Sequence, residues 1–250
     1  MKNILEIKKL YKDIRNKKIL HDINFEIKEG EFVGFVGDNG AGKTTTIRLI
    51  FNELKINQGE VLYYGESVFE NQNLKNLAFF PDSNNIPLNF TVNEYIKYIC
   101  ELSFLQNYEK KIKELCEFFN FEKHVDKKFK ELSAGMKKKA LLISILVIKP
   151  KMIILDEPTA NLDVKSKIEF MNILKLLNEN GITIMVTSHI IEELEKNINK
   201  LILIDKGKIL YKEKYDPNKE SIQQIYSKLV PNEKLDIEKL KNIVEIENER

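Results

Sequence analysis

A glycine-rich segment constrains the fold of this chain more than any other feature. The run Phe32 to Val36 predicts a fully buried strand, and Lys43 to Asn52 carries apolar residues at helical spacing. The segment that follows the predicted strand and includes the start of the predicted helix is Gly37-Asp38-Asn39-Gly40-Ala41-Gly42-Lys43-Thr44-Thr45. A strand, a glycine loop and a helix in this order are typical of a loop whose backbone N–H groups cradle phosphate groups.

This segment fits the Walker A pattern of nucleotide triphosphatases, with two glycines, a lysine and a threonine at the required spacing. Lys43 supplies a positive charge for the β and γ phosphates, and the Thr44 hydroxyl is placed to ligate Mg²⁺. The alternative is a chance glycine-rich turn, which the flanking strand and helix argue against. The sequence therefore predicts an ATPase that uses ATP and Mg²⁺, with Lys43 among its catalytic groups.

A pair of carboxylates follows a second apolar run. Met152 to Leu155 predicts a buried strand, and Asp156 and Glu157 leave its C-terminal end, where parallel sheets place their ligands. We expect Asp156 to hold the metal and Glu157 to act as the general base on the attacking water. The alternative is that both residues only cap a strand before Pro158.

Composition and charge narrow the possible partners. With 250 residues, of which 43% are hydrophobic, the chain can bury a sizeable core. The 40 Lys and Arg against 38 Asp and Glu give a formal charge of +2, so we expect no nucleic-acid partner. The run Lys137-Lys138-Lys139 is interpreted as a solvated helix face.

Three further features bear on location and redox state. The first eight residues carry charges where a signal peptide would need an apolar core, so we expect a cytoplasmic protein. The longest apolar stretch, Ala140 to Ile148, falls far short of the roughly 20 residues needed to span a bilayer. Cys100 and Cys116 lie in helical patterns without metal-ligand spacing, and we expect buried thiols.

The hydrophobic pattern divides the chain into three regions with different predicted secondary structure. The first thirty residues alternate apolar and polar, which predicts short antiparallel strands, whereas Thr91 to Ile148 predicts amphipathic helices. From Met152 onward strands alternate with helices, and Lys206-Gly207 predicts a hairpin turn. The fold class is therefore α/β, a P-loop NTPase with a mostly parallel sheet, an N-terminal antiparallel β subdomain and an inserted α-helical subdomain.

Three further segments narrow the family. Leu132-Ser133-Ala134-Gly135-Met136 resembles the LSGGQ signature, the block from Asp156 to Asp163 resembles the Walker B motif and D-loop, and Ser188-His189 resembles the switch histidine. In this order they resemble an ATP-binding cassette (ABC) ATPase over residues 3–215. The resemblance implies an ATPase domain over 1–215, with a helical subdomain at about 82–150 and a C-terminal helical extension at 216–250.

The resemblance also implies a site shared between two chains. In this family two cassettes pack head to tail, so Ser133 and Gly135 would bind the γ-phosphate held by the partner, and Asp163 would approach the partner's site. Ser133 also starts a predicted helix, Ala134 to Ile148, so an ordinary helix cap is the alternative. His189 would hydrogen-bond the γ-phosphate and help hold the attacking water.

The sequence departs from the family pattern at several positions. Asp82 stands where the glutamine loop would place its glutamine, and it remains a candidate ligand for Mg²⁺ or water against the alternative of a turn residue. Ile14 stands where an aromatic residue would stack on adenine. In the signature, Ala134 and Met136 replace glycine and glutamine, and this variant resembles exporter-type cassettes for drugs, antibiotics or ions.

The leading functional hypothesis is the ATP-hydrolysing subunit of an ABC transporter. Its partners would be a second ATPase subunit and a separate transmembrane permease, which would hold the chain at the inner face of the cell membrane. The alternative is a soluble cassette acting on ribosomes or DNA, although such members usually carry two cassettes or a long coiled coil. A cassette that binds ATP without hydrolysis is disfavoured by the presence of Glu157 and His189.

Overall fold

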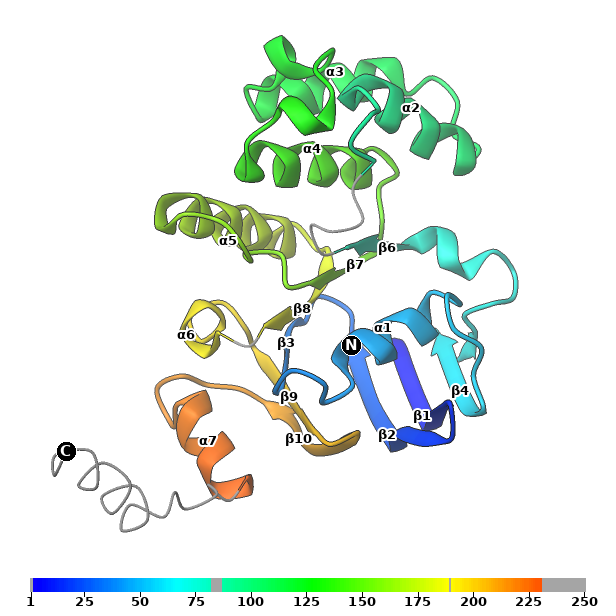
Figure 1. Ribbon diagram of the computed structural model, residues 1–250, viewed down its shortest axis with the longest axis vertical. Helices are drawn as coiled ribbons and strands as arrows, with labels where there is room; N and C mark the ends of the chain where they lie inside the picture. The colour runs from blue at the N-terminus through cyan, green and yellow to red at the C-terminus, as the bar shows by residue number, and fades with distance from the viewer. Residues whose placement is uncertain (1, 82–86, 189, 231–250) are drawn as a thin grey trace, which may run out of the picture.

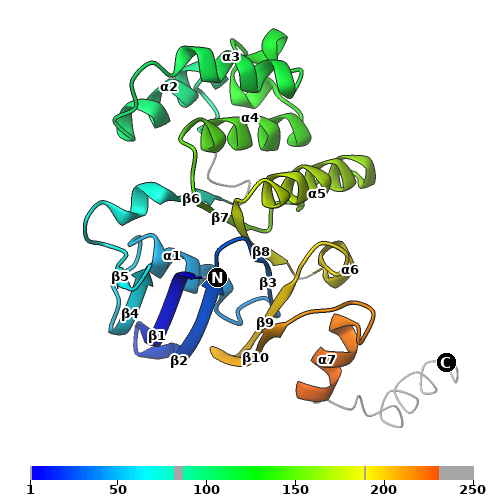
Figure 2. The ribbon, with the colours of Figure 1, turned by 180° about the vertical axis from the view of Figure 1, so that it is seen from behind.

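The computed structural model describes residues 2–81, 87–188 and 190–230. Its strands form two sheets, a six-stranded sheet at the centre and a four-stranded sheet beside it. Figures 1 and 2 show helices α2, α3 and α4 gathered at one end of the molecule and the strands of the smaller sheet toward the other. The central sheet lies between these two groups.

The central sheet is mostly parallel. Its strand order is β10-β9-β3-β8-β7-β6, and every neighbouring pair is parallel except β9 with β10. The strands span β3 (Phe32–Val36), β6 (Leu77–Phe80), β7 (Met152–Asp156), β8 (Thr183–Ser188), β9 (Lys200–Asp205) and β10 (Lys208–Lys214). The parallel strands β3, β7 and β8 therefore end at the same edge, which is where ligands bind in open α/β sheets.

The smaller sheet is antiparallel, in the order β2-β1-β4-β5. Its strands are β1 (Asn3–Ile14), β2 (Lys17–Lys28), β4 (Gln58–Tyr63) and β5 (Glu66–Ser67). The first two strands contain 12 residues each, so the expectation of short strands was wrong. Irregular pairing around Lys9 and Asp22, both with positive φ, interrupts the alternation and hides the full strand length from the sequence pattern.

Several of the helices begin with a residue whose side chain caps the N-terminus. Thr91 caps α2 in a box with Glu94, Ser133 caps α4, and Asp163 caps α5. The α-helices span α1 (Lys43–Ile50), α2 (Val92–Leu102), α3 (Glu109–Phe118), α4 (Ala134–Val147), α5 (Val164–Glu179), α6 (Ile191–Leu194) and α7 (Ile222–Leu229). The 3₁₀ turns are η1 (Asn73–Asn76), η3 (Glu122–His124) and η4 (Phe129–Glu131).

The core lies on both faces of the central sheet. Along β3, Phe32 and Val36 join a cluster that includes the helices α2 to α5, whereas Val33 and Phe35 join a second cluster with the antiparallel sheet and α1. A strand buried on both faces reads as a continuous apolar run, which explains why β3 and β7 were visible in the sequence. Cys100 and Cys116 are buried free thiols within the first cluster, as expected.

The model confirms the predicted fold class, with a mostly parallel sheet, an antiparallel sheet and a helical region. The predicted domain limits at about 82–150 and 216–250 stay predictions, because residues 82–86 and 231–250 lie outside the described part of the chain. Within the described ranges, none of the helices combines the length and apolar character that crossing a bilayer requires.

Candidate nucleotide site

The glycine loop joins the end of β3 to the start of α1, as predicted. Gly37 leaves no room for a side chain, because a Cβ there would lie 2.1 Å from the carbonyl oxygen of Ile204 in β9. Gly42 has a φ of +115°, which L side chains rarely adopt, and it immediately precedes α1. The loop is thus held close to the sheet, and its N–H groups converge at the positive end of α1.

Lys43 is buried inside this loop. Its Nζ donates hydrogen bonds to the carbonyl oxygens of Gly37, at 2.6 Å, and of Asp38, at 3.2 Å. The same Nζ lies 3.9 Å from Oε1 of Glu157. Burial lowers the pKa of Lys43, and the nearby carboxylates of Glu157, Asp156 and Asp38 oppose that shift. An ammonium held among carbonyl groups here is positioned to meet phosphate oxygens.

Asp156 connects three elements at the end of β7. It is 4% exposed, and its two carboxylate oxygens accept hydrogen bonds from the hydroxyls of Thr44, at 2.9 Å, and Thr187, at 2.6 Å. The Thr44 hydroxyl and the Asp156 carboxylate are hard oxygen donors side by side, which is the donor chemistry that Mg²⁺ prefers. Among the described residues, no group of three or more acidic, histidine or cysteine side chains could hold a metal ion, so Thr44 and Asp156 offer only part of a coordination shell.

Glu157 follows at the rim of the site, with its backbone in an uncommon conformation. Its φ is +47°, in the left-handed region, and its N–H donates to Oγ1 of Thr187 at 3.0 Å. The carboxylate is 20% exposed, so a water molecule can reach it. Lys43 and the adjacent pair Asp156 and Glu157, which are far from Lys43 in the sequence, meet at one edge of the sheet.

The signature residues lie elsewhere, at the start of α4. The Ser133 hydroxyl accepts a hydrogen bond from the N–H of Met136 at 3.3 Å, which confirms the predicted helix cap. A Cβ on Gly135 would lie 3.4 Å from Oγ of Ser166 in α5, so the N-termini of α4 and α5 are neighbours. Asp163 accepts hydrogen bonds from the N–H and hydroxyl of Ser166, which lower the pKa of Asp163.

Asp82, His189 and Ile14 are the remaining predicted site residues. Asp82 and His189 lie outside the described residues, so their roles stay predictions. His189 directly follows β8, whose last residue, Ser188, belongs to the site edge. Ile14 ends β1 and is 38% exposed, which leaves an aliphatic surface that a base could cover.

Sequence reasoning missed three residues beside this site. Thr187 bridges Asp156 and Glu157, and its position at the end of a buried strand was the available signal. Lys138 is 1% exposed, so the interpretation of residues 137–139 as a solvated face was wrong for this lysine. The buried hydroxyl of Tyr226 in α7 faces Asp38, which contributes with burial to raising the pKa of Tyr226 to about 12.

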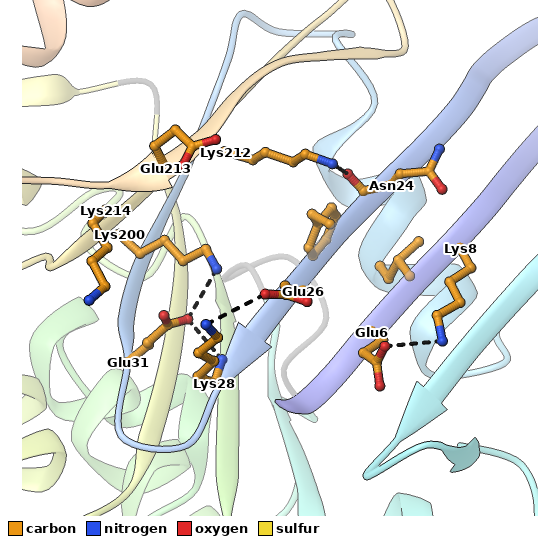
Figure 3. A pocket seen from close by; sticks show the side chains of 12 residues that line it. Glu6, Lys8, Asn24, Glu26, Lys28, Glu31, Lys200, Lys212, Glu213 and Lys214 are labelled. Carbon is orange, nitrogen blue, oxygen red and sulfur yellow. Dashed lines mark hydrogen bonds and ion pairs between the residues drawn. The ribbon is translucent and has the colours of Figure 1, made fainter. Parts of the chain in front are cut away.

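A large cavity elsewhere holds many charges but no part of the phosphate loop. It measures about 680 Å³ and lies between the antiparallel sheet and the β9–β10 hairpin (Figure 3). Lys200 and Glu31 form a buried pair at 3.3 Å, and Lys28 lies 3.7 Å from Glu26. Lys8 also pairs with Glu6, and Lys212 donates to the backbone carbonyl of Asn24. Most of the lysines that line the cavity therefore already have partners, and we assign the cavity no role in phosphate binding.

Comparisons with known proteins agree with this geometry. The family model described as ABC transporter matches residues 20–160. An ABC transporter ATP-binding protein of Mycoplasma pneumoniae is 39% identical over 83% of this chain and 66% of its own length. The uncharacterized ABC transporter ATP-binding protein YhcH of Bacillus subtilis is 34% identical over 84% of this chain and 70% of its own.

A solved structure supports the fold independently. The ATP-binding subunit of an ABC transporter superposes with a TM-score of 0.81, covering 90% of this chain and 99% of the other. At 23% identity this likeness speaks for the fold alone. The family model and the two relatives go further, and on their agreement this chain, which spans about two thirds of the length of these relatives, belongs to the ABC transporter family.

Proposed function

We propose that this chain hydrolyses ATP to power transport through a separate membrane-spanning partner. The observation that carries the proposal is the meeting of Lys43, Asp156 and Glu157 at the ends of β3 and β7. A phosphate loop with a buried lysine, a carboxylate beside a hydroxyl and a second carboxylate open to water are the parts that phosphoryl transfer to water requires.

Each of these side chains has a separate role in ATP hydrolysis. The Lys43 ammonium turns from its carbonyl partners toward the β and γ phosphates and stabilises their negative charge. The Glu157 carboxylate accepts a proton from water as the water oxygen bonds to the γ-phosphorus and the bond to the β-phosphate oxygen breaks. The backbone of Glu157 is held by Thr187 during this step. His189 would orient the same water.

Thr44 and Asp156 would hold Mg²⁺, with Asp82 as a third candidate ligand. When bound, the ion neutralises charge on the phosphate oxygens and fixes their geometry. Thr187 keeps Asp156 oriented toward Thr44 by its hydrogen bond to the other carboxylate oxygen.

Two cassettes would close around ATP. Ser133 and Gly135 begin α4 at an exposed surface, and the neighbouring N-terminus of α5 carries Asp163. Free N–H groups at a helix start favour an anion. We propose that the anion is the γ-phosphate on a second cassette, so that ATP binding closes a dimer and hydrolysis reopens it.

The experiment that tests hydrolysis and closure is Glu157→Gln. The amide cannot take the proton, so ATP binding should persist, turnover should be lost and an ATP-bound dimer should accumulate. Phosphate release and sedimentation in saturating Mg-ATP measure the two effects. Glu114→Gln, on the exposed surface of α3, is the matched control. Hydrolysis by Glu157→Gln at the parent rate would refute the base, and a persistently monomeric variant would refute the dimer.

An apolar groove supports the permease as partner. It holds about 330 Å³ and is lined by α2, α4 and β6, including Tyr95, Ile99 and Leu102. Leu102 is 57% exposed and nearby Phe104 is 79% exposed, so apolar side chains extend from the groove to the solvent. We propose that a cytoplasmic helix of the membrane-spanning partner occupies this groove and holds the chain at the membrane's inner face.

Charge substitution tests the groove. Leu102→Glu should abolish co-purification with the polytopic membrane protein identified by mass spectrometry from the parent chain, while ATP hydrolysis by the isolated chain stays unchanged. Phe118→Glu, at a 60% exposed position on α3, is the matched control. Equal recovery of the membrane protein with both variants would contradict the assignment.

We propose export as the direction of transport. The support is the signature in which Ala134 and Met136 precede a lysine run, a variant that resembles exporter-type cassettes. Everted vesicles carrying the complex should accumulate the cargo when ATP is supplied outside. Uptake confined to right-side-out vesicles, with ATP enclosed, would reverse the assignment. The alternative of a soluble factor for ribosomes or DNA has no specific observation in its favour.

A further inference from the structure

Lys138 differs from the lysines on either side of it in α4. It is 1% exposed, whereas Lys137 and Lys139 are partly exposed and Lys139 pairs with Glu169 at 2.7 Å. The phase of the helix explains the difference, because Lys138 stands at i−3 and i−4 from the buried Leu141 and Leu142. Lys138 therefore points into the molecule from the second turn of the helix that Ser133 begins.

A buried ammonium requires partners that offset its desolvation. Removing such a charge from water is strongly unfavourable unless hydrogen bonds and neighbouring charges compensate. Nζ of Lys138 lies 3.4 Å from the backbone carbonyl oxygen of Glu157 and 5.6 Å from the ring centroid of Phe80. Phe80 is the last residue of β6, which pairs with β7 through Leu155. Lys138 thus contacts the ends of two strands at the site.

The peptide groups around Glu157 are held from several sides. Its N–H donates to Thr187, and its carbonyl oxygen accepts from the N–H of Ala160 at 3.1 Å as well as facing Lys138. Glu157 keeps a φ of +47°, a conformation that a non-glycine residue holds only where its surroundings stabilise it. Lys138 is the contact in this set that comes from α4, the helix of the signature.

We propose that Lys138 is a positioning residue that links the N-terminus of α4 to the catalytic carboxylate by fixing the backbone of Glu157. This inference rests on the proposed role of Glu157 as base. When a phosphate from the second cassette engages Ser133, any shift of α4 moves the Lys138 ammonium and therefore the Glu157 peptide. A misplacement of about 1 Å at a reacting group can change a rate by about 100-fold, so this contact couples partner binding to turnover.

Two substitutions separate the hydrogen-bonding role from simple packing. Lys138→Met keeps the apolar stem and removes every donor, whereas Lys138→Gln keeps an N–H donor without the charge. We expect Lys138→Met to lower kcat for ATP hydrolysis by about tenfold or more. Its Kd for ADP, measured by calorimetry, should stay within about twofold of the parent value, because no phosphate contact is removed. Lys138→Gln should restore most of kcat.

Controls make each outcome decisive. Lys139→Met applies the same change one residue away, where it breaks the pair with Glu169, and should leave kcat unchanged. Parent-like kcat in Lys138→Met would overturn the proposal, as would equal losses of kcat, ADP binding and thermal midpoint in both Lys138 variants. If Glu157→Gln abolishes hydrolysis while Lys138→Met does not, only the positioning role fails. If Glu157→Gln hydrolyses ATP normally, the proposed base itself fails.

Discussion

The predicted nucleotide contacts fall into two groups, one around the phosphate loop and one at the starts of α4 and α5. The two groups differ in how many of their contacts are already made within this chain. Around the phosphate loop, Lys43 and Asp156 are buried, and side chains from α1, β7 and β8 hydrogen-bond to one another. At the start of α4 and α5, Ser133 and Asp163 are exposed, and within the described part of the chain their side-chain hydrogen bonds cap their own helices. The first group is organised before any ligand arrives. The second presents its helix N-termini outward.

This difference predicts two kinds of variant. Changes in the phosphate-loop group should alter how a single chain binds nucleotide. Changes in the signature group should leave that binding intact and alter only what two chains do together. A variant of one group that produced the effect expected of the other would contradict this division.

Lys43→Ala should have the largest effect. It removes the charge that meets the phosphates and also the hydrogen bonds to Gly37 and Asp38 that shape the loop. We expect ATP hydrolysis to fall by about 100-fold or more, with a parallel loss of ATP affinity. Phosphate release and equilibrium binding measure both. Lys110→Ala, on the exposed face of α3, should change neither. Parent-like affinity in Lys43→Ala would place the phosphates elsewhere.

Gly135→Asp should separate the two groups. The space at Gly135 admits a Cβ at 3.4 Å from Ser166, so folding should survive, but the added carboxylate repels a phosphate at this helix start. A single chain should keep parent-like ATP affinity, and turnover should fall by about 10 to 100-fold. Gly135→Ala is the uncharged control.

Mixing Lys43→Ala chains with Gly135→Asp chains is a stricter test of whether the two groups act across chains. A heterodimer of Lys43→Ala and Gly135→Asp chains contains one site with an intact phosphate loop and an intact signature. The mixture should therefore hydrolyse ATP faster than either variant alone. If the mixture hydrolyses ATP no faster than the two variants do separately, the two groups do not act across chains.

Thr187→Val tests whether the hydrogen bonds of Thr187 hold Asp156 and Glu157 in place, and we expect a smaller effect on ATP hydrolysis than for the variants above. It leaves Asp156 and the N–H of Glu157 each short of a partner, which should cost about 1 to 3 kcal/mol of stability and about tenfold in kcat. Thr183→Val, at the other end of β8, removes an equally buried hydroxyl that accepts from Gly30. Both variants should lose stability, but a loss of kcat in both would make the effect of Thr187 merely structural.

Local sequence patterns predicted the phosphate-loop group well. The strands β3 and β7 are continuous apolar runs because both faces of the sheet are covered, so their ends, and with them Gly37 and Asp156, could be located within about a residue. Ser133 was recognisable as a helix cap for a similar local reason. These features depend on neighbours in sequence.

The features that were missed depend on contacts between distant segments. The 12-residue length of β1 and β2 is fixed by their pairing across bulges. Lys138 was grouped with its charged neighbours, although its helical phase relative to Leu141 placed it inside. The approach of Tyr226 to Asp38 joins α7 to a loop almost two hundred residues earlier, which no local pattern encodes.

Tyr226→Phe should have the smallest effect and asks whether α7 supports the phosphate-loop group. Its buried hydroxyl faces Asp38 but lies outside normal hydrogen-bond geometry with the described residues, so its removal should change stability at neutral pH by less than about 1 kcal/mol. Burial, with Asp38 and Asp205 nearby, raises the pKa of Tyr226 to about 12, from about 10 for an ordinary tyrosine.

The folded chain therefore favours the neutral phenol. That contribution to stability is complete below about pH 10 and is lost as the pH rises toward about 12. Urea midpoints measured between these limits should fall more steeply for the parent than for Tyr226→Phe, with Tyr98→Phe, at a 47% exposed position, as the control. Identical pH profiles would mean that the Tyr226 hydroxyl is solvated and that α7 does not constrain Asp38. A large loss of ATP affinity in Tyr226→Phe would instead extend the phosphate-loop group to the C-terminal helix.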